Sequence, residues 1–519
     1  MDLAQAAGRQ WFRLLDAARG LQVIRPAAND HRFESPAWRE FPFSVIHQAF
    51  LLAEEWWAQA SDAGRGVNRH NAQIIAFTIR QLIDVFSPSN SPWLNPEVIQ
   101  ATYESGGRNF AAGFKNWLHD VQETLSGAPS GRNGLTVGRD LAITPGKVVF
   151  RNEVMELLQY APATSKVRPE PVLVVPAWIM KYYILDLSPR NSLIHYLVEQ
   201  GHTVFAISWR NPGWEQRATS LDDYRTKGIV AALDAIRAMC GEVKIHGCGY
   251  CLGGTLLAIA GAAMARDGDE RLASLTLLAA QTDFTDAGEL QLFISEDQLA
   301  FLEDLMSVQG YLDSRQMAGA FQILRSNDLI WSRLVKSYML GRPEMATDLM
   351  TWNADGTRLP ARMHSEYLRQ LFLDDDLAEG RFEVTGRPVS ISDVRLPIFA
   401  VGTETDHIAP WRSVHKIHLL NDGDITFVLA SGGHNAGIVS EPGHPHRSFR
   451  MGHRPAEGRY VGPVEWAVLA EHHEGSWWPE WRRWLGEHSG APTEPPQLGA
   501  PGAGYPVLGD APGQYVMEH

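Results

Sequence analysis

Residues 249–253 read Gly-Tyr-Cys-Leu-Gly and place Cys251 where a nucleophile is presented on a sharp turn. The alternating apolar residues before them predict a strand, and the small and apolar residues after them predict a helix. A strand, a sharp turn and a helix form the setting of the nucleophile elbow, G-x-S-x-G, here with Cys in place of Ser. The glycines let strand and helix close up, and the N-terminus of the helix favours a thiolate and, later, an oxyanion.

Two other interpretations compete for this stretch. Cys248 and Cys251 form a C-x-x-C pair, which at a strand-to-helix junction also fits a thioredoxin-like redox site. A buried cysteine with a purely structural role is the commoner case for a lone Cys. A metal site is the weakest interpretation, because Cys240 is the only other cysteine and no second pair exists to complete four ligands.

A base and a group that orients it are needed beside an elbow cysteine, and candidates for both occur later in the chain. In α/β hydrolases the order is nucleophile, acid, histidine. Asp406 follows a strand predicted at 395–401, and His434 follows a strand predicted at 426–429. Loops beyond the carboxyl ends of strands build the sites of open α/β sheets, so Cys251, Asp406 and His434 are expected to meet there.

Neighbouring residues compete for the same two roles. Glu404 and His407 flank Asp406 within two residues and carry the same kinds of side chain. The trio in the hydrolase order leaves little room for the redox interpretation, which gives the Asp and His at the strand ends no role.

The elements that must position these residues alternate between strands and helices. Besides the elbow, strands are predicted at 147–160, 171–175, 202–208 and 272–279. Helices are predicted between them at 192–199 and 221–239. Such alternation predicts an α/β-hydrolase fold, with a mostly parallel, doubly wound sheet. Helical spacing replaces it at about 284–383, which predicts a helical cap inserted before the strands return.

The two ends of the chain have other signals. Residues 1–130 are expected to form a helical N-terminal domain for packing or association, followed by a Gly/Pro-rich boundary at 127–131. Residues 131–519 are expected to form the catalytic domain. Within it, 441–458 is expected to be a loop and 477–484 a tryptophan-rich helix.

Composition excludes several classes of protein. The 519 residues are enough for two or three structural units, and a net charge of −14 argues against a nucleic-acid binder. Three cysteines do not make a disulfide framework, which favours a reducing cytoplasm. The N-terminal residues do not resemble a signal peptide, and no stretch is apolar enough to predict a transmembrane segment. The 17 tryptophans indicate large apolar surfaces, internal or exposed.

Several long motifs, in order, resemble those of the polyhydroxyalkanoate synthase family over nearly the full length of the chain. The Cys-containing lipase box is at 249–254, the first-strand motif at 175–187 and the motif of the following strand at 201–213. The acid motif is at 406–411 and the histidine motif at 432–437. Two cap motifs lie at 327–333 and 352–363, and shorter stretches near the two ends lie at 32–38 and 511–516. One departure is Met180, where the family commonly has Asn. The chain is more similar to the single-polypeptide synthases than to the two-subunit type.

The resemblance implies roles for individual residues. Cys251 is implied to carry the acyl group, His434 to activate it, and Asp406 to serve as the acid and to help activate the substrate hydroxyl. The backbone N–H of Leu252 follows the nucleophile and is expected to stabilise the oxyanion, with a second donor at Ile179. In addition, Trp352 and His407 are implied to lie at the cap and substrate side of the site.

The implied activity is polymerisation of 3-hydroxyacyl-CoA into a polyester with release of CoA. CoA is part of the substrate, so neither a cofactor nor a metal is expected. The implied partners are the growing polyester, the surface of polyester granules in the cytoplasm, and a second copy of the chain in a homodimer. Two alternatives remain: a Cys-dependent esterase or depolymerase of the same fold, and a non-catalytic granule-associated protein.

Overall fold

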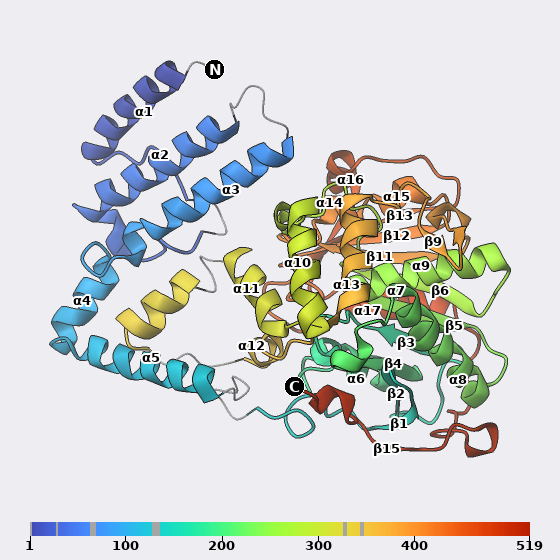
Figure 1. Cartoon of the computed structure of the whole chain (residues 1–519). Coiled ribbons are helices and arrows are strands. Elements are labelled where there is room, and N and C mark those ends of the chain that lie inside the picture. The colour runs from blue at the N-terminus through green and yellow to red at the C-terminus, as the bar shows by residue number, and fades with distance from the viewer. Residues whose placement is uncertain (1–2, 27–29, 63–68, 127–134, 325–329, 343–346) are drawn as a thin grey trace. The chain divides into compact units, whose positions relative to one another are not determined.

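The computed structural model describes residues 3–26, 30–62, 69–126, 135–324, 330–342 and 347–519. The chain divides into unit 1, Met1–Ser130 with Ala318–Met345, and unit 2, Gly131–Met317 with Ala346–His519 (Figure 1). The expected boundary at 127–131 and the first residues of the motif at 327–333 lie outside the described residues. No helix among the described residues is both long and apolar enough to cross a membrane.

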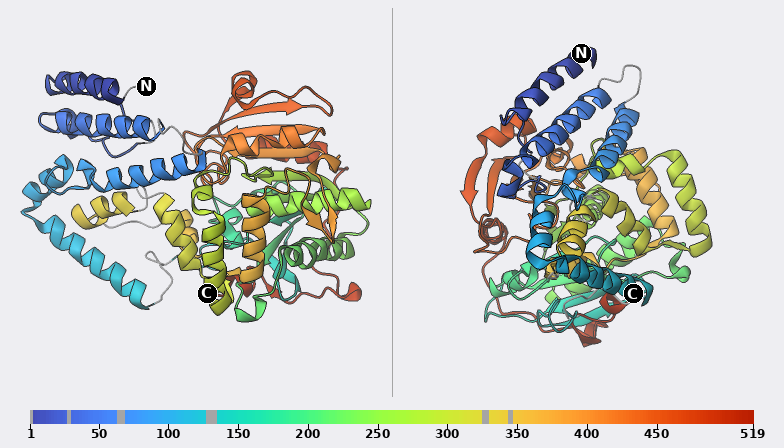
Figure 2. Two further views of the ribbon diagram at one scale, coloured as in Figure 1. Left: turned by 45° about the horizontal axis from the view of Figure 1, so that its top comes forward. Right: turned by 90° about the vertical axis from the view of Figure 1, so that its left-hand side faces the viewer.

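Unit 2 is built on a mixed sheet, for which the described residues provide eleven strands in the order β14-β13-β12-β11-β6-β5-β3-β4-β2-β1-β15. The central strands are parallel: β12 (Ile425–Ala430), β11 (Ile398–Thr403), β6 (Leu272–Leu278), β5 (Ile245–Tyr250), β3 (Val172–Val175) and β4 (Val204–Trp209). Helices flank the sheet in all three views, which explains why these strands are apolar almost throughout (Figures 1 and 2). The predicted α/β-hydrolase fold is confirmed.

Both edges of the sheet are antiparallel. One edge consists of β2 (Met155–Tyr160), β1 (Gly146–Arg151) and β15 (Gly509–Asp510), and the other of β13 (Ser448–Arg454) and β14 (Glu471–Glu474). The loop expected at 441–458 is therefore wrong, because β13 lies inside it and pairs with β12. β13 buries few of its side chains, although it pairs with both β12 and β14, so its polar and glycine residues conceal the alternation that marks a strand.

The helices of unit 2 are α6 (Leu193–Glu199), α7 (Leu221–Asp223), α8 (Ala231–Cys240), α9 (Leu252–Asp267), α10 (Glu296–Gln309), α12 (Asp348–Asn353), α13 (Ala361–Tyr367), α14 (Trp411–Val414), α15 (Ile417–Leu420), α16 (Pro463–Leu469) and α17 (Trp478–Glu487). Four short strands form two separate hairpins: β7 (Tyr311–Leu312) with β8 (Leu359–Pro360), and β9 (Glu383–Val384) with β10 (Arg387–Pro388). The tryptophans of the expected helix at 477–484 are buried in the core rather than exposed.

Unit 1 consists of helices with a small core. Its N-terminal helices are α1 (Leu3–Ala18), α2 (Phe43–Asp62), α3 (Arg69–Val85), α4 (Pro96–Ser105) and α5 (Arg108–Ser126). Trp38, Phe33 and Leu51 form a buried cluster. The break between α4 and α5 follows from Gly106, whose φ of 61° ends α4 in the left-handed conformation that glycine favours.

Part of the expected cap belongs to unit 1. α11 (Ser314–Leu324) crosses the division between the units, and the helical segment Leu334–Met339 packs against α5. The side-chain amides of Asn109 and Asn116 donate hydrogen bonds to the carbonyls of Met339 (2.8 Å) and Ser337 (3.0 Å). Helical spacing marks a helix in the sequence but does not identify its packing partner. For this reason the sequence predicted a single cap insertion at about 284–383.

Candidate active site

Cys251 lies at the turn between β5 and α9 in a conformation that non-glycine residues rarely adopt. Its φ and ψ are 52° and −126°. Its backbone N–H donates a hydrogen bond to the carbonyl of Leu278 in β6 (2.8 Å), which anchors the turn to the neighbouring strand. The side chain is 8% exposed at the N-terminus of α9. The predicted elbow is therefore present as a strained turn that is held by the sheet.

Three glycines make this turn sterically feasible. A Cβ atom on Gly249 would overlap the backbone of Gly254, with its nitrogen at 2.7 Å. On Gly253 a Cβ atom would overlap the carbonyl groups of Val175 and Pro176, in the loop that follows β3. Gly254 likewise leaves no space for a side chain, because Ala280 lies against it. The elbow therefore packs backbone to backbone against both α9 and the loop after β3.

His434 and Asp406 are brought together by two neighbouring parallel strands. Asp406 follows β11 and His434 follows β12, and the last residues of these strands, Thr403 and Ala430, pair in the sheet. Nδ1 of His434 is 2.7 Å from Oδ2 of Asp406. The carboxylate also accepts hydrogen bonds from the backbone N–H groups of Ile408 (2.9 Å) and Ala409 (2.8 Å), which fix its orientation.

The charges of this group are strongly coupled. Burial disfavours the imidazolium, but the carboxylate of Asp406 and the sulfur of Cys251 outweigh it and hold the pKa of His434 well above its ordinary value. Burial likewise disfavours the carboxylate, yet His434 and the backbone N–H donors keep the pKa of Asp406 below its ordinary value. The side chain of His434 is thus close enough to Cys251 for the sulfur to influence its pKa. The arrangement is suited to move a proton from the sulfur to the imidazole and to stabilise the resulting imidazolium.

The competing acid and base candidates lie elsewhere. Glu404 is exposed, whereas Asp406 is buried against His434. His407 is half-buried, and its carbonyl accepts a hydrogen bond from the backbone N–H of Glu289 (3.1 Å), where residue Gly288 packs closely against it. Through its backbone, His407 thus connects the acid loop to the start of the segment expected to be the cap.

The histidine loop has further supports that the sequence did not reveal. The hydroxyl of Tyr250, next to Cys251, donates a hydrogen bond to Oδ1 of Asn435 (2.6 Å), and the Tyr250 and His434 rings lie 5.6 Å apart. The indole N–H groups of Trp477 and Trp478 donate to the carbonyls of Gly437 (3.0 Å) and Ile438 (2.9 Å). Tyr250 and Asn435 occur within the motifs, but no spacing in the sequence indicates that they meet.

The two expected oxyanion donors lie on adjoining segments. Leu252 is the first residue of α9, where backbone N–H groups have no partner within the helix. Ile179 lies in the loop after β3, the loop whose first carbonyls contact the elbow at Gly253. The carbonyl of Ile179 accepts a hydrogen bond from the backbone N–H of Thr357 (3.1 Å).

Aromatic side chains surround the nucleophile from the cap side. Tyr367, at the end of α13, is buried, and its ring lies 5.9 Å from that of Trp178 in the loop after β3. Burial, and then the charge of Cys251, raise the pKa of Tyr367 well above its ordinary value. Phe372 packs 5.4 Å from Tyr367 and 4.9 Å from Phe284. Sequence reasoning missed Tyr367, because helical spacing did not indicate which face of α13 meets the elbow.

Trp352, which the resemblance implies to lie at the cap and substrate side, contacts the loop after β3. It is 3% exposed, and its indole N–H donates a hydrogen bond to the carbonyl of Lys181 (2.7 Å). Its polar atom is therefore used to hold the loop after β3.

The other cysteines have surroundings unlike those of Cys251. All three cysteines are free, Cys248 is 1% exposed within β5, and burial raises its pKa well above the ordinary thiol value. Burial also raises the pKa of Cys240 to about 12. Reactivity follows the thiolate, so neither residue is suited to act as a nucleophile.

Comparisons with known proteins agree with this geometry. Residues 170–441 match the family described as "alpha/beta hydrolase fold", and residues 29–197 match "Poly-beta-hydroxybutyrate polymerase (PhaC) N-terminus". Among solved structures, a monoacylglycerol lipase of Paleococcus ferrophilus covers 64% of this chain, at 14% identity and a TM-score of 0.37. The family model over residues 170–441 and the sheet described above define a member of the α/β-hydrolase class.

Curated relatives narrow this class. The chain is 41% identical to "Poly(3-hydroxyalkanoate) polymerase" of Methylorubrum extorquens, covering 99% of this chain and 85% of that protein. It is 36% identical to "Poly(3-hydroxyalkanoate) polymerase subunit PhaC" of Cupriavidus necator, covering 99% and 88%. The chain belongs to the poly(3-hydroxyalkanoate) polymerase family.

We predict that Gly249→Ala disrupts the elbow, because the added Cβ overlaps the backbone of Gly254 and neither segment can move away from the sheet. The expected loss of unfolding free energy is at the upper end of about 1–3 kcal/mol, with slower alkylation of Cys251 by iodoacetamide. Gly462→Ala is the matched control, since nothing lies within 4 Å of a Cβ atom there. Chemical unfolding and peptide mapping measure both effects, and equal behaviour of the two variants would contradict the steric account.

Proposed function

We propose that this protein polymerises 3-hydroxyacyl-CoA thioesters into a polyester, with the growing chain carried on Cys251. The observation that carries the proposal is the elbow cysteine beside an imidazole that is itself held by a buried carboxylate. Membership of the poly(3-hydroxyalkanoate) polymerase family over nearly the whole chain supports the choice of substrate.

The first step loads the acyl group onto the cysteine. His434 accepts the proton of the Cys251 thiol, and the thiolate attacks the thioester carbonyl. The backbone N–H groups of Leu252 and Ile179 stabilise the oxyanion of the tetrahedral intermediate. CoA leaves as a thiolate and takes the proton from His434. One thioester replaces another, so the acyl group on Cys251 stays activated.

The second step lengthens the polymer. The 3-hydroxyl of a second 3-hydroxyacyl-CoA molecule attacks the acyl group on Cys251, with His434 and Asp406 withdrawing the proton of that hydroxyl. An ester bond forms, the carbon–sulfur bond breaks, and the proton passes to the sulfur. The lengthened chain, now a CoA thioester, returns to Cys251 in a repeat of the first step. The proposed chemistry uses only side chains and backbone groups, so it requires no cofactor or metal.

Water must be kept from the acyl group, since hydrolysis would end each chain. The buried aromatic side chains Trp178, Tyr367 and Phe372 lie on the cap side of the nucleophile and are suited to exclude it. By excluding water, these aromatic side chains would favour the proposed transfer to a hydroxyl over the hydrolysis that the same fold supports elsewhere.

Product analysis after incubation of the purified protein with 3-hydroxybutyryl-CoA tests the proposal. The expected products are poly(3-hydroxybutyrate) and free CoA. Free 3-hydroxybutyrate with free CoA would instead indicate a Cys-dependent hydrolase. A protein that releases no CoA would be a non-catalytic granule-associated protein, and either result would overturn the proposal.

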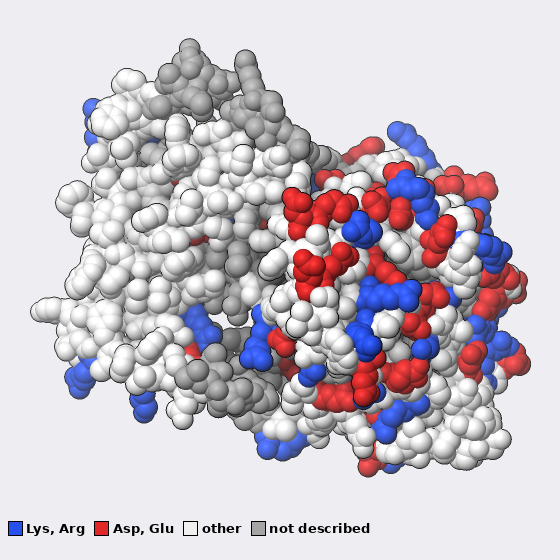
Figure 3. All heavy atoms as spheres, viewed as in Figure 1, with Lys and Arg blue, Asp and Glu red and all other residues white. Residues whose placement is uncertain are grey.

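Association with the polyester surface, in the cytoplasm, is part of the proposal. Unit 1 exposes an unusual number of large apolar side chains, among them Trp11, Phe12, Phe41, Phe86, Trp93, Tyr103 and Phe114. Few charged residues interrupt its visible face, in contrast to the densely charged face of unit 2 (Figure 3). Many exposed apolar side chains on a face with few charges are typical of an interaction site.

The proposed homodimer also depends on unit 1. The tryptophans at 477–484 are buried and cannot supply the exposed apolar surface that a dimer would use, whereas Trp11, Trp93 and Trp117 are exposed.

We predict that Cys251→Ala abolishes CoA release, by at least about 10³-fold, whereas Cys248→Ala retains most of it. Only Cys251 lies at the turn beside His434, and Cys248 is enclosed within β5. A thiol-trapping assay with 3-hydroxybutyryl-CoA measures both variants. Comparable losses would favour the C-x-x-C redox interpretation instead.

We predict that the two partners of Cys251 fail differently when substituted. In His434→Gln no group takes the proton from the sulfur, so neither loading nor chain growth should occur. In Asp406→Asn loading should be slowed but survive, because a cysteine is intrinsically nucleophilic, whereas the hydroxyl attack needs its base more. Intact-mass spectrometry should detect one or a few hydroxyacyl units on the Asn variant and none on the Gln variant. Normal elongation by Asp406→Asn would contradict the role given to Asp406.

We predict that the triple variant Phe86→Ser, Trp93→Ser, Tyr103→Ser binds amorphous poly(3-hydroxybutyrate) particles at least about 10-fold more weakly than wild type. These side chains are among the most exposed apolar groups of unit 1. Val464→Ser, Val468→Ser is the matched control, because both valines are exposed on α16 of unit 2. Cosedimentation measures the binding, and equal weakening by the control would assign no special role to unit 1.

A further inference from the structure

Three stretches of unit 2 that lie outside the Cys251, His434 and Asp406 group meet at one place. They are residues 179–183 of the loop after β3, residues 352–358 around the end of α12, and residues 511–519 at the C-terminal end of the chain. Each belongs to a motif that the sequence analysis singled out. The hydrogen bonds between them account for their association.

Lys181 lies at the centre of this junction. It is 3% exposed, and its Nζ donates hydrogen bonds to the backbone carbonyls of Glu518 (2.6 Å) and Tyr515 (3.3 Å). Among the described residues, no carboxylate lies within ion-pair distance of it. Burial lowers the pKa of Lys181, and the nearby carboxylates of Asp355 and Glu518 partly oppose this. Burying an ammonium group costs free energy, and here the hydrogen bonds to the carbonyls of residues 515 and 518 offset part of that cost.

The backbone around Lys181 is held from the opposite side by residues 352–358. The carbonyl of Lys181 accepts the hydrogen bond of the Trp352 indole (2.7 Å), and the carbonyl of Ile179 accepts that of Thr357 N–H (3.1 Å). Met180 and Gly356 form a backbone bridge between these two contacts. The contact at Met180 is made by backbone atoms.

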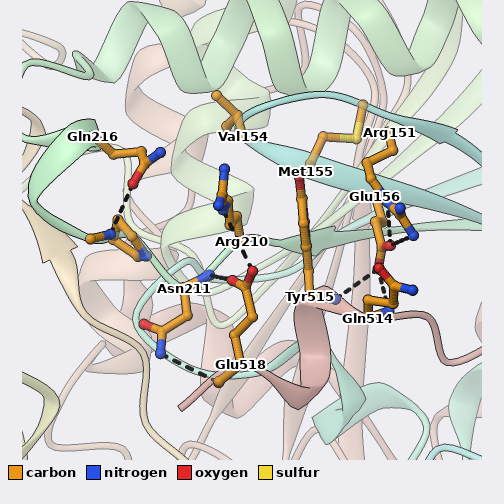
Figure 4. A network of polar contacts seen from close by, with 12 residues as sticks. Arg151, Val154, Met155, Glu156, Arg210, Asn211, Gln216, Gln514, Tyr515 and Glu518 are labelled. Carbon is orange, nitrogen blue, oxygen red and sulfur yellow. Dashed lines mark hydrogen bonds and ion pairs between the residues drawn. The ribbon is translucent and has the colours of Figure 1, made fainter.

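The C-terminal segment is itself a rigid support. The buried carboxylate of Glu156 accepts hydrogen bonds from the backbone N–H groups of Gln514 (2.8 Å) and Tyr515 (2.9 Å) (Figure 4). The Tyr515 hydroxyl donates to the carbonyl of Asn152 (2.6 Å). Glu518 accepts a hydrogen bond from the backbone N–H of Asn211 (3.0 Å), directly after β4. Residues 514–518 are thereby fixed to β2 and β4 of the sheet.

We propose that Lys181 and residues 515–518 position the backbone N–H of Ile179 as an oxyanion donor by clamping the loop after β3 between the sheet edge and residues 352–358. Lys181 is a positioning residue in this role, since it acts through the loop and touches no reacting atom. The proposal rests on the proposed function, which makes Ile179 a donor. It gives the C-terminal motif a part in catalysis although its residues lie outside the triad.

The reaction of Cys251 with two reagents separates this role from general stability. Loading from 3-hydroxybutyryl-CoA passes through a tetrahedral oxyanion, whereas alkylation by iodoacetamide displaces iodide at a saturated carbon and forms none. Loss of a whole oxyanion donor costs about 10²–10³-fold in rate, so a displaced donor should cost about 10–100-fold. The half-saturating substrate concentration should change little, because the ground-state thioester needs the donor less.

The test compares the single-turnover loading rate and the alkylation rate of Cys251 in full-length variants. Lys181→Met removes the ammonium group, and deletion of residues 517–519 removes its shorter hydrogen bond while keeping Tyr515 in place. Both variants should load about 10–100-fold more slowly and alkylate within about 2-fold of wild type. The double variant should be no slower than the slower single variant, because both changes break the same contact, between Lys181 and Glu518.

Asp510→Asn is the matched control within the same C-terminal segment. Asp510 forms an exposed ion pair with Lys147 on β1, away from the junction, so its loss should leave both rates near those of wild type. Normal loading by Lys181→Met and by the deletion variant would overturn the inference alone. A parallel fall in loading and alkylation would also overturn it, in favour of a structural role. Failure of the wild-type protein to load at all would overturn the proposed function, and this inference with it.

Discussion

The site depends on the close approach of β5, α9 and the loop after β3 around a single strained residue. Cys251 adopts a backbone conformation that costs about 1–3 kcal/mol, and it persists because the surrounding structure leaves no alternative. Gly249, Gly253 and Gly254 allow this approach by having no side chains. The first thirteen residues of α9, Leu252–Met264, are all buried, so the helix cannot shift to relieve the strain. The sulfur is consequently presented at a fixed point beside the N-terminus of α9.

Two further constraints complete the site around that point. One is electrostatic: His434 and Asp406 are both buried, and each favours the charged form of the other against the cost of burial, which stabilises the imidazolium once His434 has taken a proton. The other is mechanical: the loop after β3 touches the elbow at Gly253 and is held at Lys181 by the C-terminal segment. The elbow, the loops that carry Asp406 and His434, and the loop after β3 thus meet at one place. None of them would be placed without the parallel strands that end beside one another at this edge of the sheet.

The fold class and the positions of its central strands along the chain were predictable because each strand is a short apolar run followed by a helix or a turn. β13 was not, since a strand with few buried side chains and several polar residues lacks that signal. Asp406 and His434 could be located by their positions after strands, but spacing could not choose between Asp406 and Glu404; burial against His434 does. Tyr367 lies near Cys251, and Lys181 contacts Glu518, and both pairs are far apart in sequence. No local pattern in the sequence indicates either of them. The helical insertion was recognisable, but its division between the two units was not.

In the proposed mechanism a covalent acyl group forms on the sulfur of Cys251 during every turnover. Tandem mass spectrometry of peptides from wild-type protein, acid-quenched within the first turnovers with 3-hydroxybutyryl-CoA, tests it most directly. The account predicts a hydroxybutyryl group, or a short chain of them, on the sulfur of Cys251 and on no other residue. Polymer formation with an unmodified Cys251, or with the acyl group on Cys248 or Cys240, would contradict it.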